Sequence, residues 1–175
     1  MSKNIYHIPI RKEDRKVIIS DPRVHKGFLE YAIDFLLPCW TSIYAAQNGE
    51  VLKVKQDSKE GWFLDKFKGN KYLNYIIIKH DNGEFSQYCH LEYNWSKVKE
   101  WQIVKIGDLI WISWNTWYTS MPHLHFDVHK LVDTERWRQT IPITFHEKIK
   151  IIRDPKDATD EEKEIARKIK KGILL

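Results

Sequence analysis

The stretch YLNYIIIKHDNGEFSQYCHL, residues 72–91, contains two runs rich in Ile, Tyr and Phe with a turn signal between them. The turn signal is Asp81-Asn82-Gly83, which follows three consecutive isoleucines and His80 closely. Asn-Gly and Asp-Gly sequences between hydrophobic runs favour the tight turns of β-hairpins. The stretch therefore predicts two antiparallel strands joined by a short loop.

Similar short runs rich in Ile, Val, Tyr and Trp lie on both sides of this hairpin, separated by further turn signals such as Asn48-Gly49. Strands at this spacing are typical of antiparallel all-β domains. We therefore expect an all-β fold. The remaining strand candidates are YAIDFL (31–36), SIYAAQ (42–47), EVLKVK (50–55), IVKIGDLIWIS (103–113) and HLHFDVHK (123–130).

The two ends of the chain differ in composition from this middle region. Residues 1–24 are a polar arm with one short strand candidate, KVIIS. Residues 154–175 carry acids first and bases later, which is the charge order that a helix dipole favours, with Ile165 and Ile169 on one face. We expect an N-terminal arm (1–24), a β domain (25–146) and a charged C-terminal tail (147–175) with a short helix.

Composition narrows the class of protein. The 175 residues fit one domain, and 29 Lys plus Arg against 24 Asp plus Glu give a net charge of +5, which favours anionic surroundings. Two distant cysteines, Cys39 and Cys89, argue against a disulfide scaffold or a Cys-rich zinc finger. No apolar run is long enough for a membrane span, and no signal peptide is visible.

Four histidines and one aspartate are candidates for a metal site. Residues i and i+2 of a strand share a face, so His123 and His125 would point the same way. Asp34 is the only acid within the apolar run YAIDFLL, where a buried carboxylate needs a partner or a metal. His90 ends the run SQYCHL, and His25 begins the run that contains Asp34. Three nitrogen or oxygen ligands with an open fourth position describe a catalytic zinc site.

Three segments together resemble one family. They are HKGFLEYAIDFLLPCWTSIYAAQNGEVLKV, YIIIKHDNGEFSQYCHLEYNWSKVKEWQIVKIGDLI and SMPHLHFDV, and they resemble the lysostaphin-type zinc metallopeptidases over roughly residues 24–146, in the family's order. The most specific elements are the opening His with Asp-Phe, the Y-x-H-L segment and P-H-L-H-F. The resemblance implies antiparallel sheets that form a groove, of the barrel-sandwich hybrid type.

The resemblance also implies roles for five residues. His25, Asp34 and His125 would bind Zn²⁺, and His90 and His123 would be catalytic residues that are not ligands. One of these two would take a proton from water and the other would stabilise the developing oxyanion, and the sequence leaves open which does which. The spacing from His25 to Asp34 is longer than the common His-x-x-x-Asp form. His80 is expected to be structural.

The activity implied is zinc-dependent cleavage of peptide bonds in bacterial peptidoglycan by a monomer of the cell envelope or extracellular space. Nucleic acid is not expected as a partner. The alternative is a non-catalytic member that binds peptidoglycan or regulates a hydrolase. A cupin-like metal enzyme also uses His-x-His on a strand, but the Glu expected a few residues later is missing, since Asp127 and His129 follow instead.

Tryptophan is over-represented, with 8 Trp against only 7 Gly. When the sequence is compared with this family, five tryptophans occupy positions at which the family has glycine. Glycine serves positions with positive φ or close backbone approach, which indole cannot occupy at low cost. These residues are Trp40, Trp101, Trp111, Trp114 and Trp117.

A difference in genetic code would explain the pattern. UGA differs from the glycine codon GGA by one base, and bacterial codes exist in which UGA specifies Gly and others in which it specifies Trp. Replacing the five would give 12 Gly and 3 Trp, which is near the usual glycine fraction. UGG codons at these positions would refute the hypothesis. The competing interpretations are a stacking surface for glycans, nucleic-acid stacking and simple core packing.

Overall fold

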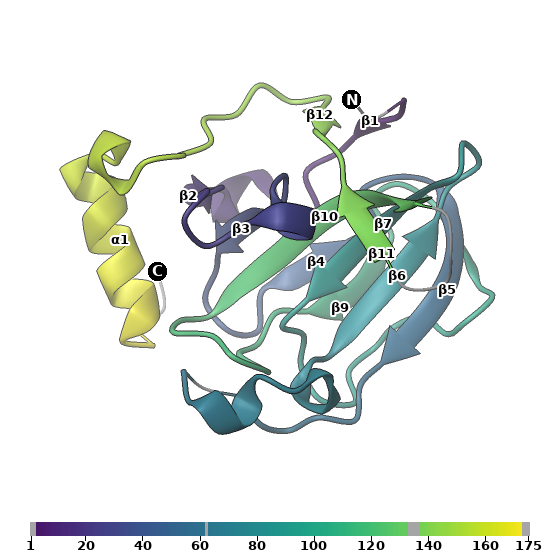
Figure 1. Cartoon of the computed structure of the whole chain (residues 1–175), viewed down its shortest axis with the longest axis horizontal. Helices are drawn as coiled ribbons and strands as arrows, with labels where there is room; N and C mark the ends of the chain where they lie inside the picture. Colours follow the sequence, from purple (N-terminus) through teal and green to yellow (C-terminus); the bar gives the residue numbers. More distant parts are fainter. Residues whose placement is uncertain (1–2, 62, 133–136, 173–175) are drawn as a thin grey trace.

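The computed structural model describes residues 3–61, 63–132 and 137–172 and shows strands throughout the middle of the chain (Figure 1). The predicted hairpin is present as β6 and β7, with Ile77 opposite Gln87. The strands are β1 (Ile5–Tyr6), β2 (Val17–Ile19), β3 (Ile33–Leu36), β4 (Ser42–Tyr44), β5 (Gly49–Lys55), β6 (Tyr75–Lys79), β7 (Glu84–Cys89), β8 (Ile103–Val104), β9 (Leu109–Ile112), β10 (His123–Val132), β11 (Trp137–Thr140) and β12 (Thr144–Phe145).

The main sheet is antiparallel throughout and is built around the long strand β10. Its order is β2-β3-β10-β7-β6-β5-β8, and β11 pairs with the second half of β10. Each of the sequence-predicted strand runs contributes a strand, so the all-β, antiparallel expectation is confirmed. The main sheet is open rather than closed into a barrel.

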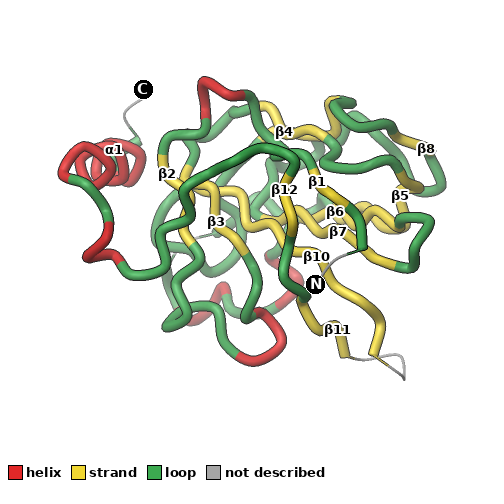
Figure 2. The backbone as a smooth tube through the Cα atoms, turned by 90° about the horizontal axis from the view of Figure 1, so that it is seen from above, coloured by secondary structure: helices red, strands yellow, loops and turns green. Residues whose placement is uncertain are grey.

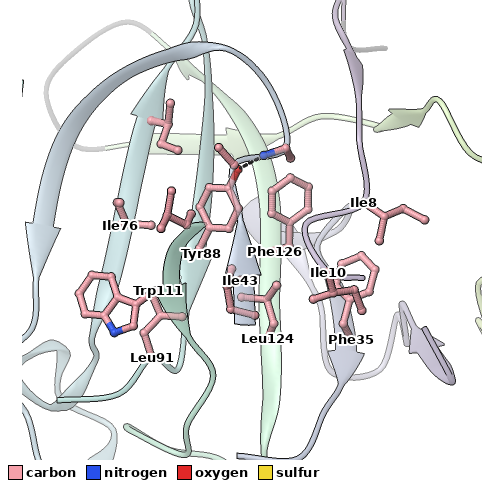
Figure 3. Close-up of a cluster of buried hydrophobic side chains, with 14 of the residues drawn as sticks. Ile8, Ile10, Phe35, Ile43, Ile76, Tyr88, Leu91, Trp111, Leu124 and Phe126 are labelled. Atoms are coloured by element: carbon pink, nitrogen blue, oxygen red, sulfur yellow. Dashed lines mark hydrogen bonds between the residues drawn. The ribbon is translucent and has the colours of Figure 1, made fainter. Parts of the chain in front are cut away.

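A second layer covers one face of this sheet. Strands β4 and β9 pair with each other, and Ile43 of β4 and Trp111 of β9 are fully buried. They belong to the same hydrophobic core as Tyr88, Leu124 and Phe126 of the main sheet, as Figure 3 shows. The core therefore lies between the β4–β9 pair and one face of β10 and β7, which leaves their other face available for a site.

The N-terminal segment contributes to this core. Strand β1 pairs in parallel with β12, and Tyr6, Ile8 and Ile10 are buried in the main hydrophobic cluster. Strand β2 joins the edge of the main sheet beside β3. The division of the chain at residues 24 and 146 stays a prediction, but the arm is packed along the domain rather than separate from its core.

The single α-helix among the described residues is α1 (Asp160–Lys170), at one side of the molecule beside β2 (Figures 1 and 2). Thr159 and Glu162 form a reciprocal capping box at its start, which satisfies two backbone N–H groups there. Ile169 is buried against Val17 and Leu36, so the predicted C-terminal helix is confirmed. Short 3₁₀ turns complete the fold at Lys12–Asp14, Gly27–Leu29, Asp65–Phe67, Asn70–Tyr72 and Pro155–Asp157.

None of the helices in the described part of the chain combines the length and apolar character needed to cross a membrane.

Three of the five unusual tryptophans have a backbone conformation that favours glycine. Trp40, Trp101 and Trp117 have φ angles of 71°, 70° and 71°. Trp111 and Trp114 are not among the described residues with positive φ, and the Trp111 indole is fully buried with its N–H donating to the carbonyl of Glu92. The backbone thus favours glycine at three of the positions, whereas Trp111 serves as a core residue.

Candidate metal centre and active site

The face of β10 that points away from the core is lined by titratable side chains. Leu124, Phe126 and Val128 are fully buried on the core side. Because side chains alternate along a strand, the residues between them share the opposite face. They are His123, His125, Asp127 and His129.

Two imidazoles and one carboxylate converge on this face. Asp34 of β3 is directly opposite His125 of β10 in the antiparallel register. Its Oδ1 lies 3.1 Å from His125 Nδ1, and its Oδ2 lies 3.3 Å from His25 Nε2. One potential ligand atom from each of the three residues lies within 4.8 Å of the others. The donor set and the spacing fit a zinc ion with an open position.

His25 reaches the site from a loop rather than from a strand. Its backbone N–H donates to the carbonyl of Asp21 at 2.9 Å, which closes a turn just before the 3₁₀ turn Gly27–Leu29. The side chain is buried, and its Nδ1 lacks a hydrogen-bond partner among the described residues. The longer spacing to Asp34 is therefore accommodated by the turns between residues 21 and 32.

Asp34 and His125 shift each other's pKa in opposite directions. Burial acts to raise the pKa of Asp34, but the neighbouring His123, His125 and His25 outweigh it and hold that pKa well below its usual value. Burial acts to lower the pKa of His125, while Asp127 and Asp34 raise it to about 10. An anionic carboxylate between imidazoles is the charge arrangement that a divalent cation completes.

His90 and His123 present the same nitrogen to the site. His90 Nδ1 lies 2.8 Å from the carbonyl oxygen of Thr116, and His123 Nδ1 lies 2.9 Å from that of Met121. A carbonyl can only accept, so each Nδ1 carries the proton and each Nε2 keeps a free lone pair. The two rings lie 4.2 Å apart between centroids, and His123 Nε2 is 3.7 Å from Asp34 Oδ1.

Both of these histidines are held neutral. Burial and the neighbouring His123 and His125 lower the pKa of His90 well below its usual value. Burial also lowers the pKa of His123, although Asp34 opposes this effect. A neutral imidazole with a free Nε2 can accept a proton from water, which is the property that a general base requires.

A cavity of about 600 Å³ opens beside the histidines. His90, His125 and Asp127 contribute to its lining together with Tyr75 and Trp117. The Trp117 indole stacks on the His90 ring with centroids 5.7 Å apart. A cavity of this size can admit part of a peptide chain next to the candidate metal centre.

The five residues expected from the sequence are therefore brought together, and two further residues join them. Asp127 and His129 extend the same face, with His129 Nδ1 2.8 Å from Asp127 Oδ1. Neither residue has a role predicted from the sequence. The alternation that paired His123 with His125 continues through HLHFDVH and could have identified both.

The remaining histidines lie elsewhere. His80 Nδ1 is 2.8 Å from the carbonyl oxygen of Asn48 and its Nε2 is 2.9 Å from Ser86 Oγ, which fits a structural role. His7 and His146 stack at 4.8 Å near Glu147. Arg15 also contacts Glu147, at 3.1 Å, and so competes with a cation for that carboxylate.

Comparisons with known sequences identify the family. A family model described as Peptidase family M23 matches residues 28–139. An uncharacterized metalloprotease of Buchnera aphidicola is 32% identical over 114 residues, covering 64% of this chain and 27% of that protein. The peptidoglycan DD-endopeptidase ShyA of Vibrio cholerae is 32% identical over 97 residues, covering 54% and 19%. Lysostaphin of Staphylococcus simulans is 31% identical over 101 residues, covering 57% and 18%. The matched region thus spans less than a third of each of these relatives.

Solved structures share the fold. A zinc-containing peptidase from Vibrio cholerae superimposes with a TM-score of 0.55 at 22% identity, covering 79% of this chain and 39% of that one. Pseudoalterin, described as an M23 metalloprotease from the deep sea, gives 0.55 at 15% identity, covering 81% and 76%. With the family model matching well over half of its length, the chain belongs to peptidase family M23.

Proposed function

We propose that this chain is a zinc-dependent endopeptidase that hydrolyses peptide bonds in the cross-links or stems of bacterial peptidoglycan. The observation that carries the proposal is the convergence of His25, Asp34 and His125, with two neutral histidines beside them. A zinc ion held by these three residues would supply Lewis acidity to the scissile carbonyl and to an attacking water.

The chain's own residues then divide the work of proton transfer and charge stabilisation. His90 and His123 each hold the Nδ1 proton against a backbone carbonyl, so their Nε2 atoms are available to take a proton from water. The imidazolium formed this way can return the proton to the leaving amine or donate a hydrogen bond to the oxyanion. The fixed Nδ1–H bonds keep both rings oriented throughout.

The choice of substrate is supported by the named relatives and by charge. ShyA and lysostaphin are among the relatives that match this chain, and ShyA is named as a peptidoglycan DD-endopeptidase. The net charge of +5 suits an anionic cell-wall polymer. A site of action in the cell envelope or outside the cell, and a monomeric state, are part of this proposal.

The alternative of a non-catalytic peptidoglycan-binding member is favoured by one observation. The Trp117 indole lines the cavity and stacks on His90, so it occupies space beside the proposed base. In the non-catalytic case, the cavity would bind peptidoglycan without hydrolysing it. The presence of all five expected site residues counts against this alternative.

Digestion of purified peptidoglycan with and without a chelator, followed by mass analysis of the released fragments, tests the proposal. We expect chelator-sensitive release of peptide fragments and about one zinc per chain. His125→Ala should lose both zinc and activity. His90→Gln and His123→Gln should keep zinc and lose activity by about 100-fold or more, the usual contribution of a general acid or base.

The exposed His146 supplies a comparison variant, because His146→Gln changes a histidine that lies away from the cavity, in the second potential metal group with His7 and Glu147. This variant should keep wild-type zinc content and turnover. Zinc retained by His125→Ala would contradict the ligand assignment. Zinc binding without any fragment release from peptidoglycan would favour the non-catalytic alternative.

A further inference from the structure

The row of titratable side chains on β10 continues beyond the proposed metal ligand. Asp127 lies two residues after His125 on the same face, and its Oδ2 is 3.5 Å from His125 Nε2. The other ring nitrogen, Nδ1, faces Asp34 at 3.1 Å. His125 therefore lies between two carboxylates, one on each side of its ring.

The two ring nitrogens cannot play the same role once a metal is bound. The nitrogen that binds a metal must offer its lone pair, so the other nitrogen carries the proton. Nδ1 lies 3.1 Å from Oδ1 of Asp34, and Asp34 Oδ2 lies 3.3 Å from His25 Nε2, so Nδ1 faces the proposed ligand Asp34. Nε2 must then carry the proton, and Asp127 Oδ2 is the carboxylate oxygen next to it.

Asp127 is itself held in place by a second histidine. His129 Nδ1 lies 2.8 Å from Asp127 Oδ1, and the His129 ring stacks on Phe85 with an interplanar angle of 11°. Asp127 and His129 are 3% and 1% exposed, so water cannot readily replace these contacts. An aspartate buried to this degree needs such partners to remain ionised.

We propose that Asp127 is a positioning residue for the metal centre: held by His129, it accepts the Nε2–H of His125 and so presents the Nδ1 lone pair to the metal. The inference rests on the proposed function and goes beyond it, because neither Asp127 nor His129 is a ligand or a proton donor to substrate. Carboxylate partners of this kind orient ligand histidines and raise their basicity.

The zinc dissociation constant is the main readout, measured by competition with a chelator of known affinity. Asp127→Ala removes the acceptor, and Asp127→Asn keeps the shape but removes the charge. We expect the dissociation constant to rise by about 10–100-fold in both, the usual range for such partners. Asp127→Glu should recover part of the affinity, and His129→Phe should cause a smaller rise because Asp127 itself remains.

A second readout reports the tautomer directly. In the zinc-loaded protein labelled with ¹⁵N at histidine, we expect His125 to show a protonated Nε2 and a metal-bound Nδ1. The exposed Asp65, which pairs only with Lys68 among the described residues, supplies the control variant Asp65→Asn. It should leave both the dissociation constant and the His125 signals unchanged.

The outcomes separate the two proposals. Wild-type protein that binds no zinc would overturn both the proposed function and this inference. Wild-type binding together with an unchanged dissociation constant in folded Asp127→Ala would overturn the inference alone. Metal bound through Nε2 of His125 would also overturn it, since Asp127 would then stand on the metal side of the ring.

Discussion

The histidines of the site differ in which ring nitrogen faces a hydrogen-bond acceptor. His90 and His123 place Nδ1 against backbone carbonyls, so their Nε2 lone pairs face the site. His125 is reversed, with Nδ1 toward Asp34 and Nε2 toward Asp127. Under the proposed function, the neighbouring acceptors would determine which ring binds the metal and which acts as a base, because they fix where each proton resides.

The tryptophans with positive φ give a prediction at single positions. Trp101 has φ of 70° and is 66% exposed, so its indole gains little from burial while its backbone is strained. We expect Trp101→Gly to raise the free energy of unfolding by about 1 kcal/mol, the scale of the left-handed penalty. Denaturant unfolding followed by circular dichroism measures the change.

Trp111 is the matched control for that substitution. Its indole is fully buried and its backbone is not in the left-handed region, so Trp111→Gly should lower the free energy of unfolding by about 3–5 kcal/mol. Equal effects at the two positions would contradict the conformational argument. Whether these tryptophans are encoded by UGA is a separate question, which the codons of the gene answer.

At the scale of elements, local sequence predicted most strands but few of their partners. Asp81-Asn82-Gly83 fixed the β6–β7 hairpin, because a tight turn pairs adjacent strands. The pairing of β3 with β10 brings together Asp34 and His125, which are 91 residues apart, and the parallel pairing of β1 with β12 joins the N-terminal arm to Thr144–Phe145. Such pairings depend on the packed whole, so no local pattern predicts them.

The candidate site shows the same division. Alternation along β10 predicted that His123 and His125 share a face. The proximity of Asp34 and His90 to these histidines was predicted only from the family resemblance. It depends on strand register and on the positive φ of His90, 63°, which arise from tertiary contacts. The alternation also places Asp127 and His129 on this face, whereas their contacts with His125 and with each other come only from the folded structure.

His80 connects three elements and gives a pH prediction. It links Asn48, just before β5, to Ser86 of β7, and burial lowers its pKa below the usual value. The folded state therefore prefers neutral His80, so its contribution to stability is present above about pH 6.5 and is lost as the pH falls through the lowered pKa. His80→Gln should remove this component of the acid sensitivity.

Unfolding free energies of both proteins between pH 8 and pH 4 check the prediction. We expect His80→Gln to be less stable by about 1–3 kcal/mol at pH 8, because its partners lose optimal hydrogen bonds in a buried site. The difference from wild type should narrow toward pH 4. Parallel profiles across the range would show that His80 does not contribute to the pH dependence.

At the scale of the whole molecule, the site joins segments far apart in the chain. His25 comes from the loop before β3, Asp34 from β3, His90 from the end of β7, and His123 and His125 from β10. Binding a metal to His25, Asp34 and His125 would connect the loop before β3 to the neighbouring strands β3 and β10. Metal binding should therefore be linked to the stability of the entire fold.

We expect zinc to raise the free energy of unfolding of the wild-type chain by about 4 kcal/mol when free zinc is about 1,000 times the dissociation constant, since only the folded state gathers the three ligands. Thermal unfolding at a series of zinc concentrations measures this effect. His125→Ala, which removes a ligand, should unfold at the same temperature with and without zinc. His123→Gln should keep the full zinc-dependent shift, because His123 lies beside the ligand set without belonging to it. An equal shift in His125→Ala would mean that zinc stabilises the fold from another site, such as the His7, His146 and Glu147 group.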